Sequence, residues 1–74
     1  MARKKLISVL VPCYNEEACV PALGEALRRA FAASPAYDFE AILVDNGSVD
    51  RTWELLQALR ARDRRFKLLS LMRN

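Results

Sequence analysis

Val44-Asp45-Asn46-Gly47-Ser48-Val49-Asp50 is the stretch that decides the fold. It follows the apolar run Phe39–Leu43 and precedes the helix-patterned Thr52–Arg62, so a strand ends among carboxylate, amide and hydroxyl groups beside a helix N-terminus. A similar end lies upstream, where Leu6–Val11 is followed by Pro12-Cys13-Tyr14-Asn15-Glu16-Glu17. Ligands of open α/β sheets bind beyond the carboxyl ends of the parallel strands. The two loops therefore predict half of a site for a ligand with polar edges and phosphates.

Hydrophobic spacing predicts an α/β fold with the order β-α-β-α-β. Short apolar runs rich in β-branched residues indicate strands covered on both faces, and apolar residues three and four apart indicate helices. Short connections between these elements require parallel strands with right-handed crossovers. We expect strands at Leu6–Val11, Phe39–Val44 and Phe66–Leu71, and helices at Glu17–Ala33 and Thr52–Arg62, the second with an apolar stripe that starts at Val49.

The expected sheet leaves one face uncovered. If the strands neighbour in the order 3-2-1, both helices lie on the same face and the other exposes apolar side chains, which a stable soluble monomer rarely does. A core formed by 74 residues also rarely supplies more than about 3–5 kcal/mol. We therefore expect residues 1–74 to be the incomplete N-terminal part of a larger domain, poorly folded or self-associating when isolated.

Composition narrows the classes of function. A chain that is 53% hydrophobic and 28% charged is globular. The net charge of +3 comes mainly from Arg3-Lys4-Lys5 and from a run of bases near the second helix C-terminus. That run either forms the solvated end of the helix or weakly attracts phosphates or anionic membranes. No aromatic residues interleave with the bases, so we expect no nucleic-acid partner.

Several chemistries are excluded by residues that the chain lacks. It has no histidine, no glycine-rich dinucleotide or phosphate loop, and no zinc-ligand spacing. Cys13 and Cys19 are expected to pack, which favours a reduced cytoplasmic compartment. A basic start followed by an apolar run resembles a signal peptide. Because Pro12 and Glu16-Glu17 follow directly, we do not expect one. No apolar run approaches the ~18 residues that span a membrane.

Three segments carry a family resemblance over the whole chain. They are Val9-Leu10-Val11-Pro12-Cys13-Tyr14-Asn15-Glu16-Glu17, Ile42–Thr52 around the deciding stretch, and Leu71-Met72-Arg73-Asn74. In this order and spacing they resemble the N-terminal nucleotide-binding part of family 2 glycosyltransferases of the GT-A fold. The first segment is most like the branch that charges polyprenyl phosphates, such as dolichol-phosphate mannose synthase.

The resemblance implies roles in the first loop. Tyr14 would lie against the face of the nucleotide base, the alternative being a tyrosine that packs at a sheet edge. Pro12 would end the first strand and fix the path of the loop. Glu16 would accept hydrogen bonds from ribose or base, whereas Glu17 would favour the N-terminus of the first helix. Asn15 would either cap that helix or contact the ligand.

The second loop departs from the family pattern at one position. Val44, Asp45 and Asn46 would lie at the nucleotide, with Asp45 near the ligand or purely structural. The family has a second acid where this chain has Asn46, whose amide would still recognise the base but without a charged acceptor. The remaining polar residues would be structural, allowing the turn and satisfying the N–H groups that open the second helix: Gly47, Ser48 and Asp50.

The resemblance also implies a donor, an acceptor and a cation. The donor is a nucleotide-diphosphate sugar and the acceptor a polyprenyl phosphate, reached at the cytoplasmic face of the membrane through parts beyond this chain. The divalent cation of the family, Mg²⁺ or Mn²⁺, uses an Asp-x-Asp pair that these residues lack, and no catalytic residue is assigned. Two alternatives stay open: a non-catalytic remnant that binds nucleotide weakly or packs on a partner, and a basic interaction module.

Overall fold

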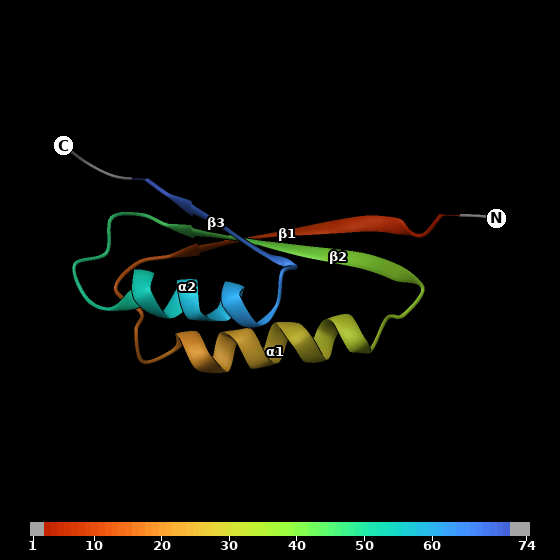
Figure 1. The fold of residues 1–74 in the computed structure, drawn as a ribbon, viewed down its shortest axis with the longest axis horizontal. Coiled ribbons are helices and arrows are strands. Elements are labelled where there is room, and N and C mark those ends of the chain that lie inside the picture. The colour runs from red at the N-terminus through yellow and green to blue at the C-terminus, as the bar shows by residue number, and fades with distance from the viewer. Residues whose placement is uncertain (1–2, 72–74) are drawn as a thin grey trace.

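The fold is three parallel strands with two helices on one side. The computed structural model describes residues 3–71. Along the chain it contains β1 (Lys5–Cys13), α1 (Val20–Ala32), β2 (Tyr37–Asp45), α2 (Thr52–Arg62) and β3 (Phe66–Ser70) (Figure 1). The strands are hydrogen-bonded in the order β1-β2-β3. The predicted β-α-β-α-β order, parallel sheet and strand neighbours are confirmed.

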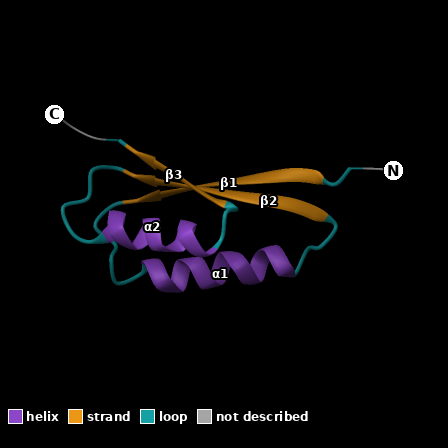
Figure 2. Ribbon diagram, viewed as in Figure 1, coloured by secondary structure: helices purple, strands orange, loops and turns teal. Residues whose placement is uncertain are grey.

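The core lies between the sheet and the helix pair. Both helices run beneath the same face of the sheet (Figure 2). Side chains of that face alternate with those of the other along each strand, so that Ala41 and Leu43 are fully buried. Phe66 on β3 and Leu56 on α2 complete the layer, both 0% exposed. The predicted stripe on α2 is right for Leu56, but Val49 lies before the helix and is 81% exposed.

The other face of the sheet is uncovered and exposes apolar side chains beside a polar Ser8–Glu40 pair. Leu6 and Leu10 on β1 are 59% and 68% exposed, and Leu69 on β3 is 49% exposed. Pro12, Val44 and Leu69 stand in one row across the three strands, at the end nearest the loops. The expected bare face is therefore present within the described residues.

Pro12 does not end β1, contrary to the prediction. β1 continues through Pro12 to Cys13, whose carbonyl accepts the N–H of Asn46 at 3.0 Å. Because neighbouring residues of a strand point their backbone groups to opposite sides, the nitrogen of Pro12 faces away from β2. A missing N–H is tolerated there, at the edge of the described sheet.

The predicted start of α1 is three residues too early. α1 begins at Val20, with Pro21 in its first turn, where a proline nitrogen has no intrahelical acceptor to satisfy. Its end at Ala32 lies before Ser34-Pro35, as expected. β2 is longer than predicted at its start, and β3 ends at Ser70 rather than Leu71. The predicted Arg73-Asn74 pair lies outside the described residues.

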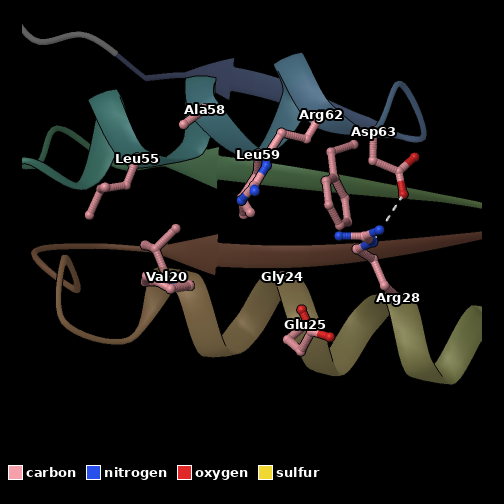
Figure 3. Close-up of a pocket in the computed structure, with 11 residues that line it drawn as sticks. Val20, Gly24, Glu25, Arg28, Leu55, Ala58, Leu59, Arg62 and Asp63 are labelled. Atoms are coloured by element: carbon pink, nitrogen blue, oxygen red, sulfur yellow. Dashed lines mark ion pairs between the residues drawn. The ribbon is translucent and has the colours of Figure 1, made fainter.

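The helices approach each other closely at Gly24. A β-carbon there would lie 2.5 Å from Cδ2 of Leu59, so glycine allows the contact between α1 and α2. Beside it runs a groove of about 250 Å³ (Figure 3). The Arg28–Asp63 ion pair, 3.8 Å long, crosses one end of this groove. The groove lies between the helices, and its lining extends from Val20 at the start of α1 to Asp63 beyond the end of α2.

Candidate nucleotide-binding site

The loops that follow β1 and β2 lie at the same end of the sheet. Residues 14–19 join β1 to α1 and residues 46–51 join β2 to α2, both at the left of Figure 1. The strands that lead into them are paired, with Cys13 opposite Asp45. The predicted convergence of the two loops is therefore present.

Tyr14 and Asn46 begin these two loops on neighbouring strands. Tyr14 is 52% exposed, and the residue before it accepts the N–H of Asn46. Glu16 is also exposed; its backbone N–H donates to the hydroxyl of Thr52 and its carbonyl accepts the N–H of Cys19, both at 2.8 Å. An exposed aromatic ring, a carboxylate and an amide are thus brought together at one edge. Their contact with a nucleotide stays a prediction, as does that of Pro12 and Val44.

Asp45 is buried and organises the turn beside it. It is 3% exposed, and its Oδ1 accepts the N–H of Ser48 at 3.0 Å and the hydroxyl of Ser48 at 2.6 Å. The turn between them passes through Gly47 at φ 79°, a conformation that favours glycine. The structural role predicted for Gly47 is confirmed. Asp45 therefore has a structural role in this turn. Its predicted contact with a ligand stays a prediction.

Asn15 links the loops and does not cap α1. Its φ is 48°, in the left-handed region that asparagine tolerates better than most residues. Its N–H donates to the hydroxyl of Ser48, and its Oδ1 accepts the N–H of Val49, both at 2.8 Å. The N-cap residue of α1 is Cys19, with no side-chain cap. The capping alternative for Asn15 is therefore wrong, and the ligand alternative stays a prediction.

Glu17 serves the second loop rather than the first helix. Its Oε1 accepts the N–H of Arg51 at 3.3 Å, and its own N–H donates to Asp50 at the same distance. α1 begins only at Val20, three residues after Glu17, and its first turn holds no acidic residue. The predicted role of Glu17 at the α1 N-terminus is wrong for this reason.

Ser48 and Asp50 divide the role predicted for them. Asp50 does satisfy α2, since its Oδ1 accepts the N–H of Thr52 at 2.9 Å and the Thr52 hydroxyl at 2.6 Å. The hydroxyl bond lowers the pKa of Asp50 below its usual value. Ser48, in contrast, bonds to Asp45 and Asn15 and does not open the helix.

Thr52 was missed by the sequence reasoning. It is fully buried and joins the β1–α1 loop, through the N–H of Glu16, to Asp50. The available signal was the spacing of hydroxyl residues after acids: Ser48 three residues after Asp45, and Thr52 two residues after Asp50. Short side chains at these spacings bond the backbone of their own turn.

The cysteines beside the site are free thiols. Cys13 is buried, and burial together with the carboxylates of Glu16 and Asp45 raises the pKa of its thiol. At neutral pH it is therefore a protonated, packed side chain rather than a nucleophile. Packing is confirmed for Cys13 and wrong for Cys19, which is exposed.

The carboxylates of this end do not form a metal centre by themselves. Among residues 3–71, no three acidic or cysteine side chains converge as ligands. Asp45 and Asp50 direct oxygen atoms to hydroxyls of their own loop. The residues present therefore do not fit the cation that the family resemblance implies. In the same part of the chain, neither helix is long and apolar enough to cross a membrane.

Comparison with known proteins gives the family. The model of the family described as "Glycosyl transferase family 2" matches residues 8–74, so the chain belongs to this family. It is 55% identical over 60 residues to the undecaprenyl-phosphate 4-deoxy-4-formamido-L-arabinose transferase of Pseudomonas paraeruginosa, covering 78% of this chain. It is 47% identical over 55 residues to the transferase of the same name from Aeromonas hydrophila, covering 72%. The matched regions span 17% and 16% of these relatives' length.

Proposed function

We propose that this chain is the nucleoside-binding part of a glycosyltransferase that moves a sugar from a nucleotide diphosphate to a polyprenyl phosphate. The observation that carries the proposal is the joined pair of loops, which presents Tyr14, Glu16 and Asn46 at the carboxyl end of the sheet. Membership of glycosyl transferase family 2 supports the reaction class. The names of the similar transferases support the acceptor.

Each exposed group suits one part of a nucleoside. The ring of Tyr14 offers a flat apolar surface for the base, and aromatic–base stacking is tolerant of which base it is. The carboxylate of Glu16 is an acceptor for ribose hydroxyls. The amide of Asn46 can present either an oxygen or an NH₂ group to the edge of the base. Together they recognise the nucleoside part of the donor.

The reaction proposed is a single displacement with inversion. A phosphate oxygen of the acceptor forms a bond to the anomeric carbon, while the bond from that carbon to the nucleoside diphosphate breaks. Because the acceptor phosphate is already ionised, it needs no general base, whereas a hydroxyl acceptor would. A polyprenyl acceptor would place the reaction at the cytoplasmic face of a membrane.

Binding of the donor is tested by calorimetry with the whole polypeptide that carries these residues. UDP, GDP, CDP and ADP are titrated in turn into the parent and into Tyr14→Ala. We expect at least one diphosphate to bind, and Tyr14→Ala to weaken that binding. A parent that binds none of the four contradicts the proposal.

The acceptor is tested separately with labelled nucleotide sugars. Undecaprenyl phosphate is compared with undecaprenol, which has the same chain and no phosphate. We expect transfer to the phosphate alone. Transfer to undecaprenol, or to neither, contradicts the acceptor proposed here.

The uncovered face of the sheet favours a second candidate, a non-catalytic remnant that packs on a partner. Exposed Leu6, Leu10 and Leu69 are the surface that such a partner would cover. This candidate predicts a stable complex and no nucleotide affinity, so the titration above separates the two.

A further inference from the structure

Two hydroxyl groups join the loops through the same arrangement of atoms. In each, a backbone N–H of the first loop donates to a hydroxyl, which donates in turn to an aspartate carboxylate at the end of β2 or in the β2–α2 loop. The first relay runs from Asn15 through Ser48 to Asp45, with distances of 2.8 and 2.6 Å. The second runs from Glu16 through Thr52 to Asp50, also with 2.8 and 2.6 Å. We call them the two hydroxyl relays.

Each relay is held on the carboxylate side as well. The Oδ1 that accepts the hydroxyl also accepts the backbone N–H of the same residue, at 3.0 Å for Ser48 and 2.9 Å for Thr52. Hydrogen bonds to a carboxylate are stronger than those between neutral groups. The hydroxyl oxygens are thereby fixed in place as acceptors for the first loop.

The relays hold the backbone on either side of Tyr14 and Glu16, together with the bonds that the side chain of Asn15 and both groups of Glu17 make to the second loop. Asn15, between Tyr14 and Glu16, adopts a left-handed conformation that persists only when its surroundings determine it. Its N–H is fixed by Ser48, and the next N–H, that of Glu16, is fixed by Thr52. Thr52 is fully buried, so without its hydroxyl the N–H of Glu16 would lose its protein acceptor. The loop would then shift relative to Asn46.

We propose that Ser48 and Thr52 are positioning residues for nucleotide binding, because their hydroxyls set the β1–α1 loop against the β2–α2 loop. The inference rests on the function proposed above and deepens it. Neither residue touches the nucleotide in this account. Each acts through the backbone of the residues that carry Tyr14 and Glu16.

The test uses paired variants in the whole polypeptide that carries these residues. Thr52→Val keeps the shape of the side chain and removes the hydroxyl, whereas Thr52→Ser keeps the hydroxyl. Ser48→Ala removes the other relay at a less buried position. Ser34→Ala is the matched control, since it removes a hydroxyl from the α1–β2 connection at the opposite end of the sheet. The probe is whichever of UDP, GDP, CDP and ADP binds the parent most tightly.

Two readouts separate positioning from stability. Calorimetry should show binding about fivefold to tenfold weaker for Thr52→Val and Ser48→Ala, at temperatures where both are folded. Thr52→Ser and Ser34→Ala should bind like the parent. Hydrogen exchange followed by mass spectrometry should be faster in peptides covering residues 14–17 of the two weakened variants, without ligand.

The outcomes distinguish the two proposals. If the parent binds a diphosphate and folded Thr52→Val and Ser48→Ala bind it equally well, the positioning role is wrong and the proposed function stands. If Thr52→Val does not fold, the affinity of folded Ser48→Ala is compared with that of the parent, and equal affinity shows that the positioning role is wrong. A parent that binds none of the four diphosphates overturns both proposals together.

Discussion

The two ends of the sheet are stabilised in different ways. At the carboxyl ends of the strands, hydrogen bonds cross between loops more than thirty residues apart in sequence. At the amino ends, the hydrogen bonds of the α2–β3 turn are local: the backbone N–H, Nε and Nη2 of Arg65 all donate to Asp63, two residues earlier. The contact that links this turn to α1 is the longer Arg28–Asp63 ion pair, at 3.8 Å. The difference shows that one end holds two loops in a fixed relation, whereas the other closes a single turn.

Apolar packing follows the same division. At the amino ends, Phe31 stacks on Phe39 with ring centroids 4.8 Å apart, and the guanidinium of Arg65 lies 4.8 Å from the centre of the Phe31 ring. At the carboxyl ends, the aromatic ring of Tyr14 is half exposed. An end that packs its aromatic rings contributes stability, and an end that exposes one is suited to binding. Variants at the two ends should therefore change different measurable quantities.

The largest expected effect is on stability, at the amino ends. Phe31→Ala removes a side chain that is 4% exposed and stacked on Phe39, and should lower the free energy of unfolding by about 3–5 kcal/mol. Denaturant unfolding of the whole polypeptide measures it, and Phe31→Leu, which keeps most of the volume, should lose less. A loss below 1 kcal/mol, on the order of an exposed substitution, would show that this end is not a core.

The next effect is on affinity, at the carboxyl ends. Tyr14→Ala should weaken nucleoside diphosphate binding by about 1–3 kcal/mol, the range for base–aromatic stacking, with unfolding unchanged. Tyr37→Ala is the matched control, because Tyr37 is 43% exposed against 52% for Tyr14 and lies at the other end. Equal affinities for the two variants in calorimetry would show that Tyr14 packs at the sheet edge and does not bind the base.

Asn46 gives a sharper test within the same end. Asn46→Leu should cost about 1–3 kcal/mol of affinity, because a donor on the base is left unpaired, whereas Asn46→Asp should retain or improve affinity through a charged acceptor. The backbone bond from Asn46 to Cys13 does not depend on the side chain and should persist in both. Parental affinity for Asn46→Leu, in a protein of intact stability, would remove Asn46 from the site.

The smallest effect expected is a dependence of stability on pH. Hydrogen bonds from Arg65 lower the pKa of Asp63, so its contribution to stability is present above the unfolded pKa of about 4 and is lost as the pH falls through the folded pKa. Asp63→Asn should remove this part of the acid sensitivity and leave nucleotide affinity unchanged. The free energy of unfolding of parent and variant is measured across this pH range. A difference between the two that does not change with pH would contradict the role given to Asp63.

The parts predicted from sequence are those fixed by local patterns. α2 has the predicted bounds of Thr52–Arg62, because its apolar spacing and the carboxylate of Asp50 are both adjacent in sequence. The strand order follows from short connections and from the handedness of parallel crossovers. The bare face of the sheet follows from both.

The parts that could not be predicted depend on contacts between distant residues. Glu17 looks like the first residue of α1, yet its N–H and its carboxylate both bond to the second loop, thirty-three and thirty-four residues away. Asn15 carries the side chain of a helix cap and instead holds a left-handed turn against Val49. Pro21, in the first turn of α1, is the local signal in the sequence that marks the true helix start.

Hydrogen exchange of the whole polypeptide, with and without the diphosphate that binds it best, tests most directly the claim that the nucleoside binds where these two loops meet. The account predicts slower exchange in peptides covering residues 12–17 and 44–50, with no change in those covering 33–39 and 63–66. Protection confined to the amino ends, or to the groove between α1 and α2, would contradict it.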